Sequence, residues 1–195
     1  MALPQKQQAL AGELLEENSQ VLARGRRLTD SLSESQLNWR PQGGGWSIAL
    51  VLEHLCLAVE GYLGPARKAA GLPTAPKGGP DTKWQPSIGG QLLLTALRTP
   101  LKLPAPPALQ PRNGPRPDVR NEFIRFHTDL SRLLESVVGL EWKKIEIPSP
   151  ASRFLTMNIG DAFVILVKHA QKHLGQVEGI RSRPEFPAGT ATPQP

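Results

Sequence analysis

NIGDAFVILVKHAQKHLGQVEGIR, residues 158–181, is the stretch that decides the fold and carries most of the candidate site. Asn158 suits the N-cap of a helix, and Asp161 stands three residues on, where a capping box places its acid. On that helix His169 and His173 are offset by about 40° and about 6 Å along the axis, so both imidazoles can reach one ion. Gln176 projects on the same side and is a candidate for orienting a ligand or facing a substrate.

A third histidine, His54, belongs to another predicted helix, which begins near Ser47 and runs to about residue 62. Glu53 and Glu60 form a narrow polar stripe on this helix, and His54 lies about a quarter-turn away among apolar residues. A buried imidazole without a partner is costly, so His54 needs a hydrogen bond or a metal. With the pair on the last helix it completes the count of a three-histidine site with one open coordination position.

From the residues alone, these histidines are either metal ligands or histidines that bind no metal, because an H-x-x-x-H pair also arises by chance on helices. Cys56 lies about 200° around the helix from His54, cannot share its metal, and is expected to be a small core residue. The fourth histidine, His127, has no partner four residues away. We interpret it as a surface histidine or one whose hydrogen bonds are satisfied within the fold.

Hydrophobic periodicity predicts an all-α chain with four main helices, at about residues 5–31, 47–62, 118–138 and 158–181. Twelve of the 20 prolines fall within residues 65–117, which we expect to form a long irregular excursion interrupted by a short helix at 88–98. A second, shorter connection spans 139–157. We expect one domain over residues 1–187 and a frayed tail at 188–195.

Composition is that of an ordinary soluble protein of 195 residues, with 39% hydrophobic and 21% charged residues. We expect no membrane span, because no apolar run approaches roughly 18 residues, and no secretory signal. One cysteine suits a reducing, cytoplasmic location. The net charge of +6 would favour acidic partners such as nucleic acid, but the basic residues are scattered, so a solvated basic surface is expected. Lys168 and Lys172 beside the histidine pair could favour an anionic substrate.

Four short motifs, taken in order, resemble the DinB-like superfamily, whose members are also described as YfiT-type metal-dependent hydrolases. They are WRPQGGGWSI at 39–48, EHL at 53–55, NIGDA at 158–162 and HAQKHLGQ at 169–176. The resemblance implies a four-helix bundle in up-down-down-up order with a long crossover between helices 2 and 3. It also implies a nickel, zinc or iron ion on His54, His169 and His173, and a homodimer. The proline-rich insert departs from the family pattern, and would either cover the site or form an interface.

The function that this resemblance implies is metal-dependent hydrolysis, or thiol-dependent S-transfer, through a water or a thiolate at the three-histidine site. Relatives with known activity use low-molecular-weight thiols such as bacillithiol, mycothiol or glutathione, so the expected partner is a small molecule. Two alternatives stay open. One is a non-catalytic, stress-related binding module with structural histidines, and the other, less favoured, is a basic nucleic-acid binder.

Overall fold

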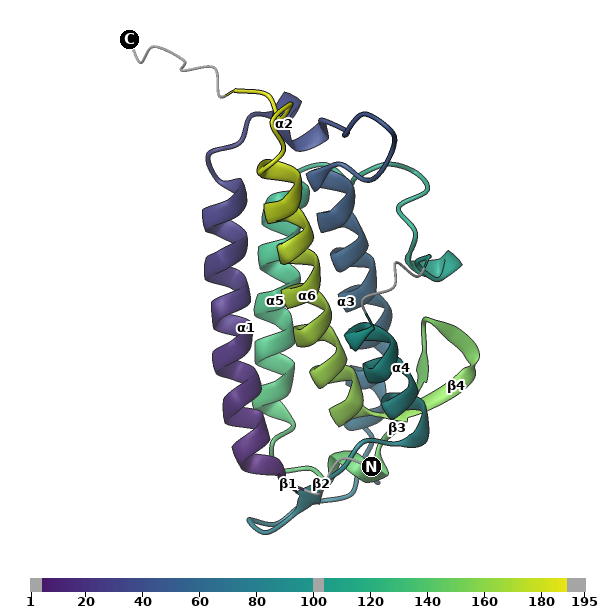
Figure 1. Ribbon diagram of the computed structural model, residues 1–195. Coiled ribbons are helices and arrows are strands. Elements are labelled where there is room, and N and C mark those ends of the chain that lie inside the picture. Colours follow the sequence, from purple (N-terminus) through teal and green to yellow (C-terminus); the bar gives the residue numbers. More distant parts are fainter. Residues whose placement is uncertain (1–4, 100–103, 189–195) are drawn as a thin grey trace.

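The computed structural model describes residues 5–99 and 104–188, and four long helices dominate it (Figure 1). The chain runs up α1, down α3, down α5 and up α6, so the predicted all-α bundle in up-down-down-up order is confirmed. A long crossover joins the lower end of α3 to the upper end of α5. The long helices are α1 (Gln7–Thr29), α3 (Ile48–Ala70), α5 (Val119–Ser136) and α6 (Ile159–Arg181).

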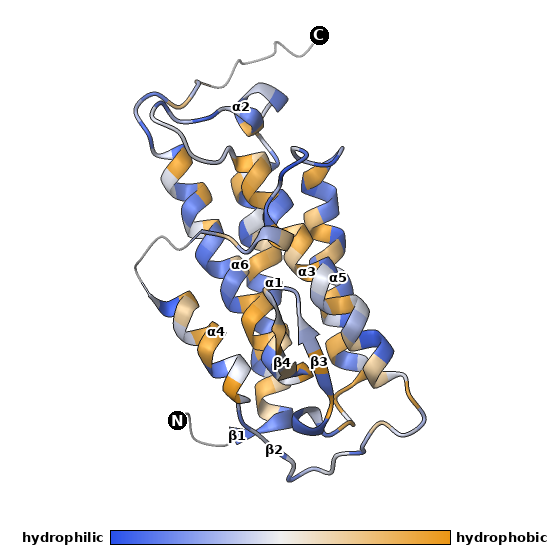
Figure 2. Cartoon of the chain, turned by 90° about the vertical axis from the view of Figure 1, so that its right-hand side faces the viewer, coloured by the Kyte–Doolittle hydropathy of each residue, from blue (hydrophilic) through white to orange (hydrophobic). Residues whose placement is uncertain are grey.

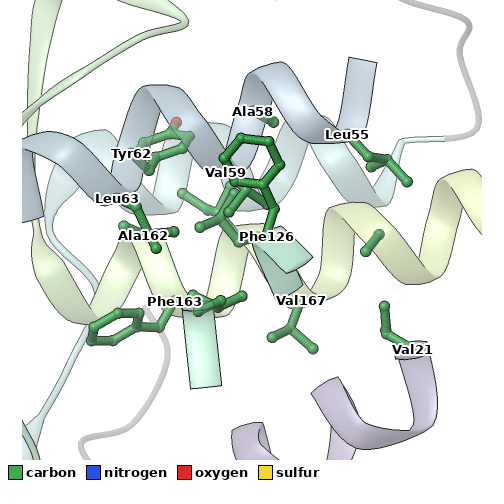
Figure 3. Packing of buried hydrophobic residues seen from close by; sticks show 14 of the residues in the cluster. Val21, Leu55, Ala58, Val59, Tyr62, Leu63, Phe126, Ala162, Phe163 and Val167 are labelled. Atoms are coloured by element: carbon green, nitrogen blue, oxygen red, sulfur yellow. The ribbon is translucent and has the colours of Figure 1, made fainter. Parts of the chain in front are cut away.

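The bundle is held by apolar faces that meet at its centre. α1 and α3 lie diagonally opposite, and each packs against both α5 and α6. Figure 3 shows Val21, Val59, Phe126 and Val167, one from each long helix, converging in this core. All four are buried, and burying a side chain of this kind contributes about 1.5–3 kcal/mol. Figure 2 shows the same pattern, with hydrophobic faces turned inward and hydrophilic faces outward.

Short elements fill the connections, and they include strands that the all-α prediction left out. In the 139–157 connection, β3 and β4 form an antiparallel hairpin in which Ile147 pairs with Met157. Near the N-terminus β1 pairs with β2, with Gln5 opposite Trp84. The remaining bounds are α2 (Glu34–Asn38), α4 (Ile88–Arg98), η1 (Pro107–Leu109), η2 (Trp142–Lys144), β1 (Gln5–Lys6), β2 (Lys83–Trp84), β3 (Glu146–Ser149) and β4 (Ser152–Asn158).

α3 is longer than predicted, because it continues past residue 62 to Ala70 with Pro65 inside it. A proline removes one backbone hydrogen bond, but Leu63 and Ala66 on either side are buried and keep the helix against the bundle. At this length α3 is apolar enough to cross a membrane, which the sequence analysis did not foresee. Since 72% of its most apolar window is buried within the fold, we interpret it as the core helix of the bundle.

The start of α6 is capped as predicted, and the same residues hold α4 in place. The side chains and backbone amides of Asn158 and Asp161 form a reciprocal capping box. Asp161 also accepts hydrogen bonds from the Ser87 hydroxyl at 2.6 Å and the Ser87 amide at 3.2 Å, at the N-cap of α4. Gly90 packs so close to the Asp161 carboxylate that a Cβ there would overlap it. One buried carboxylate therefore joins the first turns of two helices.

The crossover is tied to α3 by Arg116. Its guanidinium donates to Glu53 at 2.9 and 3.0 Å and to Glu60 at 3.1 Å, so the predicted glutamate stripe faces a cation from the insert. Of these carboxylates Glu53 is the buried one. The two glutamates and the crossover are thereby held together beside the helix that carries His54. Residues 189–195, nearly all of the expected frayed tail, lie outside the described residues.

Candidate metal centre

His54, His169 and His173 come together where α3 meets α6. The Nε2 atoms of His54 and His169 are 3.0 Å apart, and the three ring centroids are separated by 4.5–4.8 Å. Each residue offers one ligand nitrogen, and these nitrogens all lie within 4.8 Å of one another. The structure therefore brings together the three histidines that the sequence singled out.

Two of the imidazoles are oriented by hydrogen bonds on the ring nitrogen that points away from the cluster. Nδ1 of His54 lies 2.7 Å from the carbonyl oxygen of Leu109, and Nδ1 of His173 lies 2.8 Å from Oε1 of Gln176. Both oxygens accept, so each Nδ1 must donate, which leaves the Nε2 lone pair of each ring facing the cluster. The His54 lone pair faces Nε2 of His169 at 3.0 Å, a separation that requires either a proton or a cation between them.

The environment keeps the three rings neutral. Burial lowers the pKa of His54, and it lowers the pKa of His173 to about 4, with the nearby His54 adding to that shift. The pKa of His169 falls well below its ordinary value, first through burial and then through the other two histidines. A neutral imidazole is the form that binds a metal. At neutral pH the cluster therefore presents ligand nitrogens without first having to release protons.

Cys56 is fully buried and takes no part in the cluster, in agreement with the prediction. Burial raises the pKa of its thiol to about 12. Thiols of that acidity are inert at neutral pH because the thiolate is the reactive form.

Of the two interpretations of His127, the structure excludes a surface position and supports a buried ring with one of its two nitrogens hydrogen-bonded. Its side chain is 1% exposed, and its Nδ1 donates to Oδ1 of Asn18 at 2.7 Å. Its Nε2 has no hydrogen-bond partner among residues 5–99 and 104–188. Burial without a charged partner lowers its pKa to about 3. The sequence alone could not identify its partner, because Asn18 lies on α1, 109 positions away along the chain.

Two neighbours of the cluster escaped the sequence analysis as site residues. The Leu109 carbonyl belongs to the proline-rich insert, and no side-chain signal could mark a backbone acceptor. Trp46 packs its ring 5.0 Å from that of His54, centroid to centroid, and closes one side of the site. Trp46 was visible as part of the GGGW segment before α3, but that segment carried no information about where the ring would lie.

The fold and the site together define a class of protein, helical bundles whose second and last helices bring histidines together beside a long crossover. The chain belongs to the DinB superfamily, whose family model matches residues 17–177 and so spans all three histidines. A search of curated proteins finds no match to the chain.

Among solved structures, the chain is similar to YfiT from Bacillus subtilis, described as a probable metal-dependent hydrolase with an unusual four-helix bundle topology. The two share 14% sequence identity and a TM-score of 0.57, with 91% of this chain and 89% of the other covered. At that identity the likeness shows the fold.

Proposed function

We propose that the protein is a metal-dependent enzyme that holds one divalent ion on His54, His169 and His173. The observation that carries the proposal is the pair of outward hydrogen bonds, to Leu109 and Gln176, which aim imidazole lone pairs at one point. Three neutral nitrogen ligands suit zinc, nickel or iron, and they leave at least one coordination position for a small molecule. The family membership and the description of YfiT support the same reading.

When bound, such an ion would lower the pKa of a water or a thiol at its open position and produce a nucleophile at neutral pH. Hydrolysis and thiol-dependent S-transfer both use that chemistry, and a low-molecular-weight thiol is the expected co-substrate of the second. The chain contributes orientation and shielding. Leu109 and Gln176 hold two rings, and Trp46 covers His54. Tyr62 also lines the cavity, but its buried hydroxyl lies 3.3 Å from the hydroxyl of Ser149.

Elemental analysis of the purified protein tests the proposal. We expect about one ion per chain in the wild type and substoichiometric metal in His173→Ala, since two nitrogens hold an ion more weakly than three. His127→Asn is the matched control, because it removes the histidine that lies outside the cluster and should keep the full metal content. Circular dichroism of each variant shows whether the bundle has formed. Full metal content in folded His173→Ala would overturn the three-histidine site.

A non-catalytic binding module is the second candidate, and one observation favours it. A proton on Nε2 of His169 would satisfy the 3.0 Å contact with His54, so the cluster can be stable as a hydrogen-bonded group. Under this reading the protein purifies metal-free and well folded, and adding zinc or nickel leaves its melting temperature unchanged. A rise in melting temperature with either ion, absent in His173→Ala, would favour the enzyme instead.

A further inference from the structure

The histidine cluster opens on a cavity that is much larger than a water or a small thiol requires. Its volume is about 1210 Å³, above the range of about 300–1,000 Å³ that is usual for small-molecule sites. One face of α6 lines it from Ile165 to Ile180, a length of about 22 Å at 1.5 Å per residue. His169 and His173 lie partway along this face, and His54 lines the same cavity from α3. The space is therefore elongated, and the candidate metal centre occupies its middle portion.

The wall opposite α6 is α4, part of the proline-rich insert. Leu93, Ala96 and Leu97 follow one another at helical spacing and line the cavity, and Figure 2 shows α4 as a short, largely hydrophobic helix beside the bundle. On the bundle side the lining is Ala58, Tyr62, Ile165 and Leu166, with Leu155 from β4. This portion, which we call the apolar arm, extends from the histidines toward the start of α6.

The apolar arm is a built space, because α4 is fixed to α6 at both ends. At its N-terminus Ser87 donates to the buried Asp161. At its C-terminus the ammonium group of Lys172 donates to the carbonyl oxygens of Leu97 at 2.9 Å and Thr99 at 3.4 Å. Leu93 and Leu97 are partly buried against the core and also line the cavity between these anchors. An apolar ligand that covers what remains exposed of them gains free energy.

The charge lining the cavity has one sign. Arg112, Lys172 and Arg183 line it, and no aspartate or glutamate does among the residues that the structure describes. Arg183 pairs with Glu185 at 3.5 Å, whereas Arg112 makes no ion pair with any residue in 5–99 or 104–188. Lys172 lies one residue before His173 on α6 and lines the cavity together with His169 and His173.

We infer that the site takes an amphipathic anion, with an aliphatic chain in the apolar arm and an anionic group near the histidines and Lys172. The inference rests on the proposed function, because it treats the histidines as the reacting end of the cavity. From Ile165 to His173 the arm is about 12 Å long, which suits a chain of roughly eight to ten carbons. The positive charges of Arg112, Lys172 and Arg183 disfavour an amine with a chain of the same length.

Isothermal titration of hexanoate, octanoate and decanoate into the protein, both EDTA-treated and zinc-loaded, tests the inference. Affinity should rise about fourfold for each added methylene, and octanoate should bind about tenfold more tightly than octylamine. Equal affinity for hexanoate and decanoate, or for octanoate and octylamine, would overturn it.

Two variants with matched controls locate the ligand. Leu93→Trp fills the arm and should abolish the dependence on chain length, whereas Leu92→Trp, at a side chain 58% exposed on the other face of α4, should preserve it. Lys172→Gln should narrow the preference for octanoate over octylamine. Lys168→Gln should not, since Lys168 is paired with Glu17 at 2.6 Å outside the cavity. Chain-length dependence retained in Leu93→Trp would place the ligand elsewhere and overturn the inference.

Titrations of the EDTA-treated protein separate this inference from the proposed metal-dependent enzyme. Chain-length dependence without any metal binding leaves an amphipathic-anion site and removes the metal-dependent enzyme. Metal bound at the three histidines without chain-length dependence removes the substrate class and keeps the metal centre.

Discussion

Replacing His127 by asparagine should make the stability of the protein less sensitive to acid. An asparagine amide can take the place of the imidazole Nδ1 that donates to Asn18, so the variant keeps the 2.7 Å hydrogen bond and loses the titrating ring. The pKa of His127 is about 3 in the folded protein against an ordinary 6.5. Between those values the unfolded chain binds a proton that the folded chain does not.

The sign and size of the effect follow from this difference in proton binding. Because the unfolded state takes up the proton, lowering the pH favours unfolding, by up to about 1.36 kcal/mol per pH unit for one histidine. From about pH 7 to about pH 5.5 the contribution of His127 is about 1.2 kcal/mol. The three clustered histidines also have lowered pKa values, so they too reduce the free energy of unfolding on acidification. Their contribution is the same in the wild type and in His127→Asn.

Urea unfolding in EDTA at the two pH values measures this contribution. On acidification the free energy of unfolding of the wild type should fall by about 1.2 kcal/mol more than that of His127→Asn, whatever the variant's stability at neutral pH. Leu130→Ala, a buried truncation on the same helix that titrates nothing, is the control and should follow the wild-type pH dependence. Equal losses in the wild type and His127→Asn would refute the reasoning, and would mean that the ring accepts a proton within the fold.

Three further perturbations address other parts of the fold. Gly90→Ala forces a Cβ into the carboxylate that joins α4 to α6, and should lower the free energy of unfolding by about 1–3 kcal/mol. Gly12→Ala, with open space around it, should raise the free energy of unfolding by up to about 1 kcal/mol. Thermal denaturation compares the two variants. Arg116→Ala leaves buried Glu53 without its cation and should cost about 3 kcal/mol in urea unfolding, and an unchanged midpoint would contradict that role. Cys56 should react with a thiol reagent such as DTNB only as fast as the protein unfolds, because its thiol is buried and its pKa is about 12; a rapid reaction at neutral pH would disprove its burial.

The parts of the fold predictable from sequence were those fixed by local periodicity and by caps. The bounds of α4 were predicted to the residue, and α6 began at its Asn158 cap, because each signal lies within one turn of the helix it starts. The end of α3 was misjudged because Pro65 reads locally as a stop, whereas burial of its neighbours decides the matter. The β3–β4 hairpin was missed because its pairing depends on contact with the bundle.

The candidate site divides in the same way. The three histidines could be chosen from helical spacing, since His169 and His173 share a helix face and His54 lies on an otherwise apolar one. Their meeting point, the carbonyl of Leu109 and the burial of His127 all depend on contacts between residues more than fifty positions apart. Such contacts leave no periodic trace in a single sequence. The apolar arm likewise appears only once α4 is placed against α6.

The hydrogen bond from His54 to Leu109 gives the crossover a part in assembling the centre. Until that segment docks, the His54 ring is free to carry its proton on either nitrogen and to turn away from its partners. The contact with Leu109 selects one tautomer and one orientation of His54, so the irregular connection orients a ring that a regular helix supplies. If the proposed ion binds at the three histidines, its binding is thermodynamically linked to the contact between the crossover and His54, and adding zinc should protect the crossover from proteolysis. The crossover, although it has the composition of a linker, thus helps to order the site beside it.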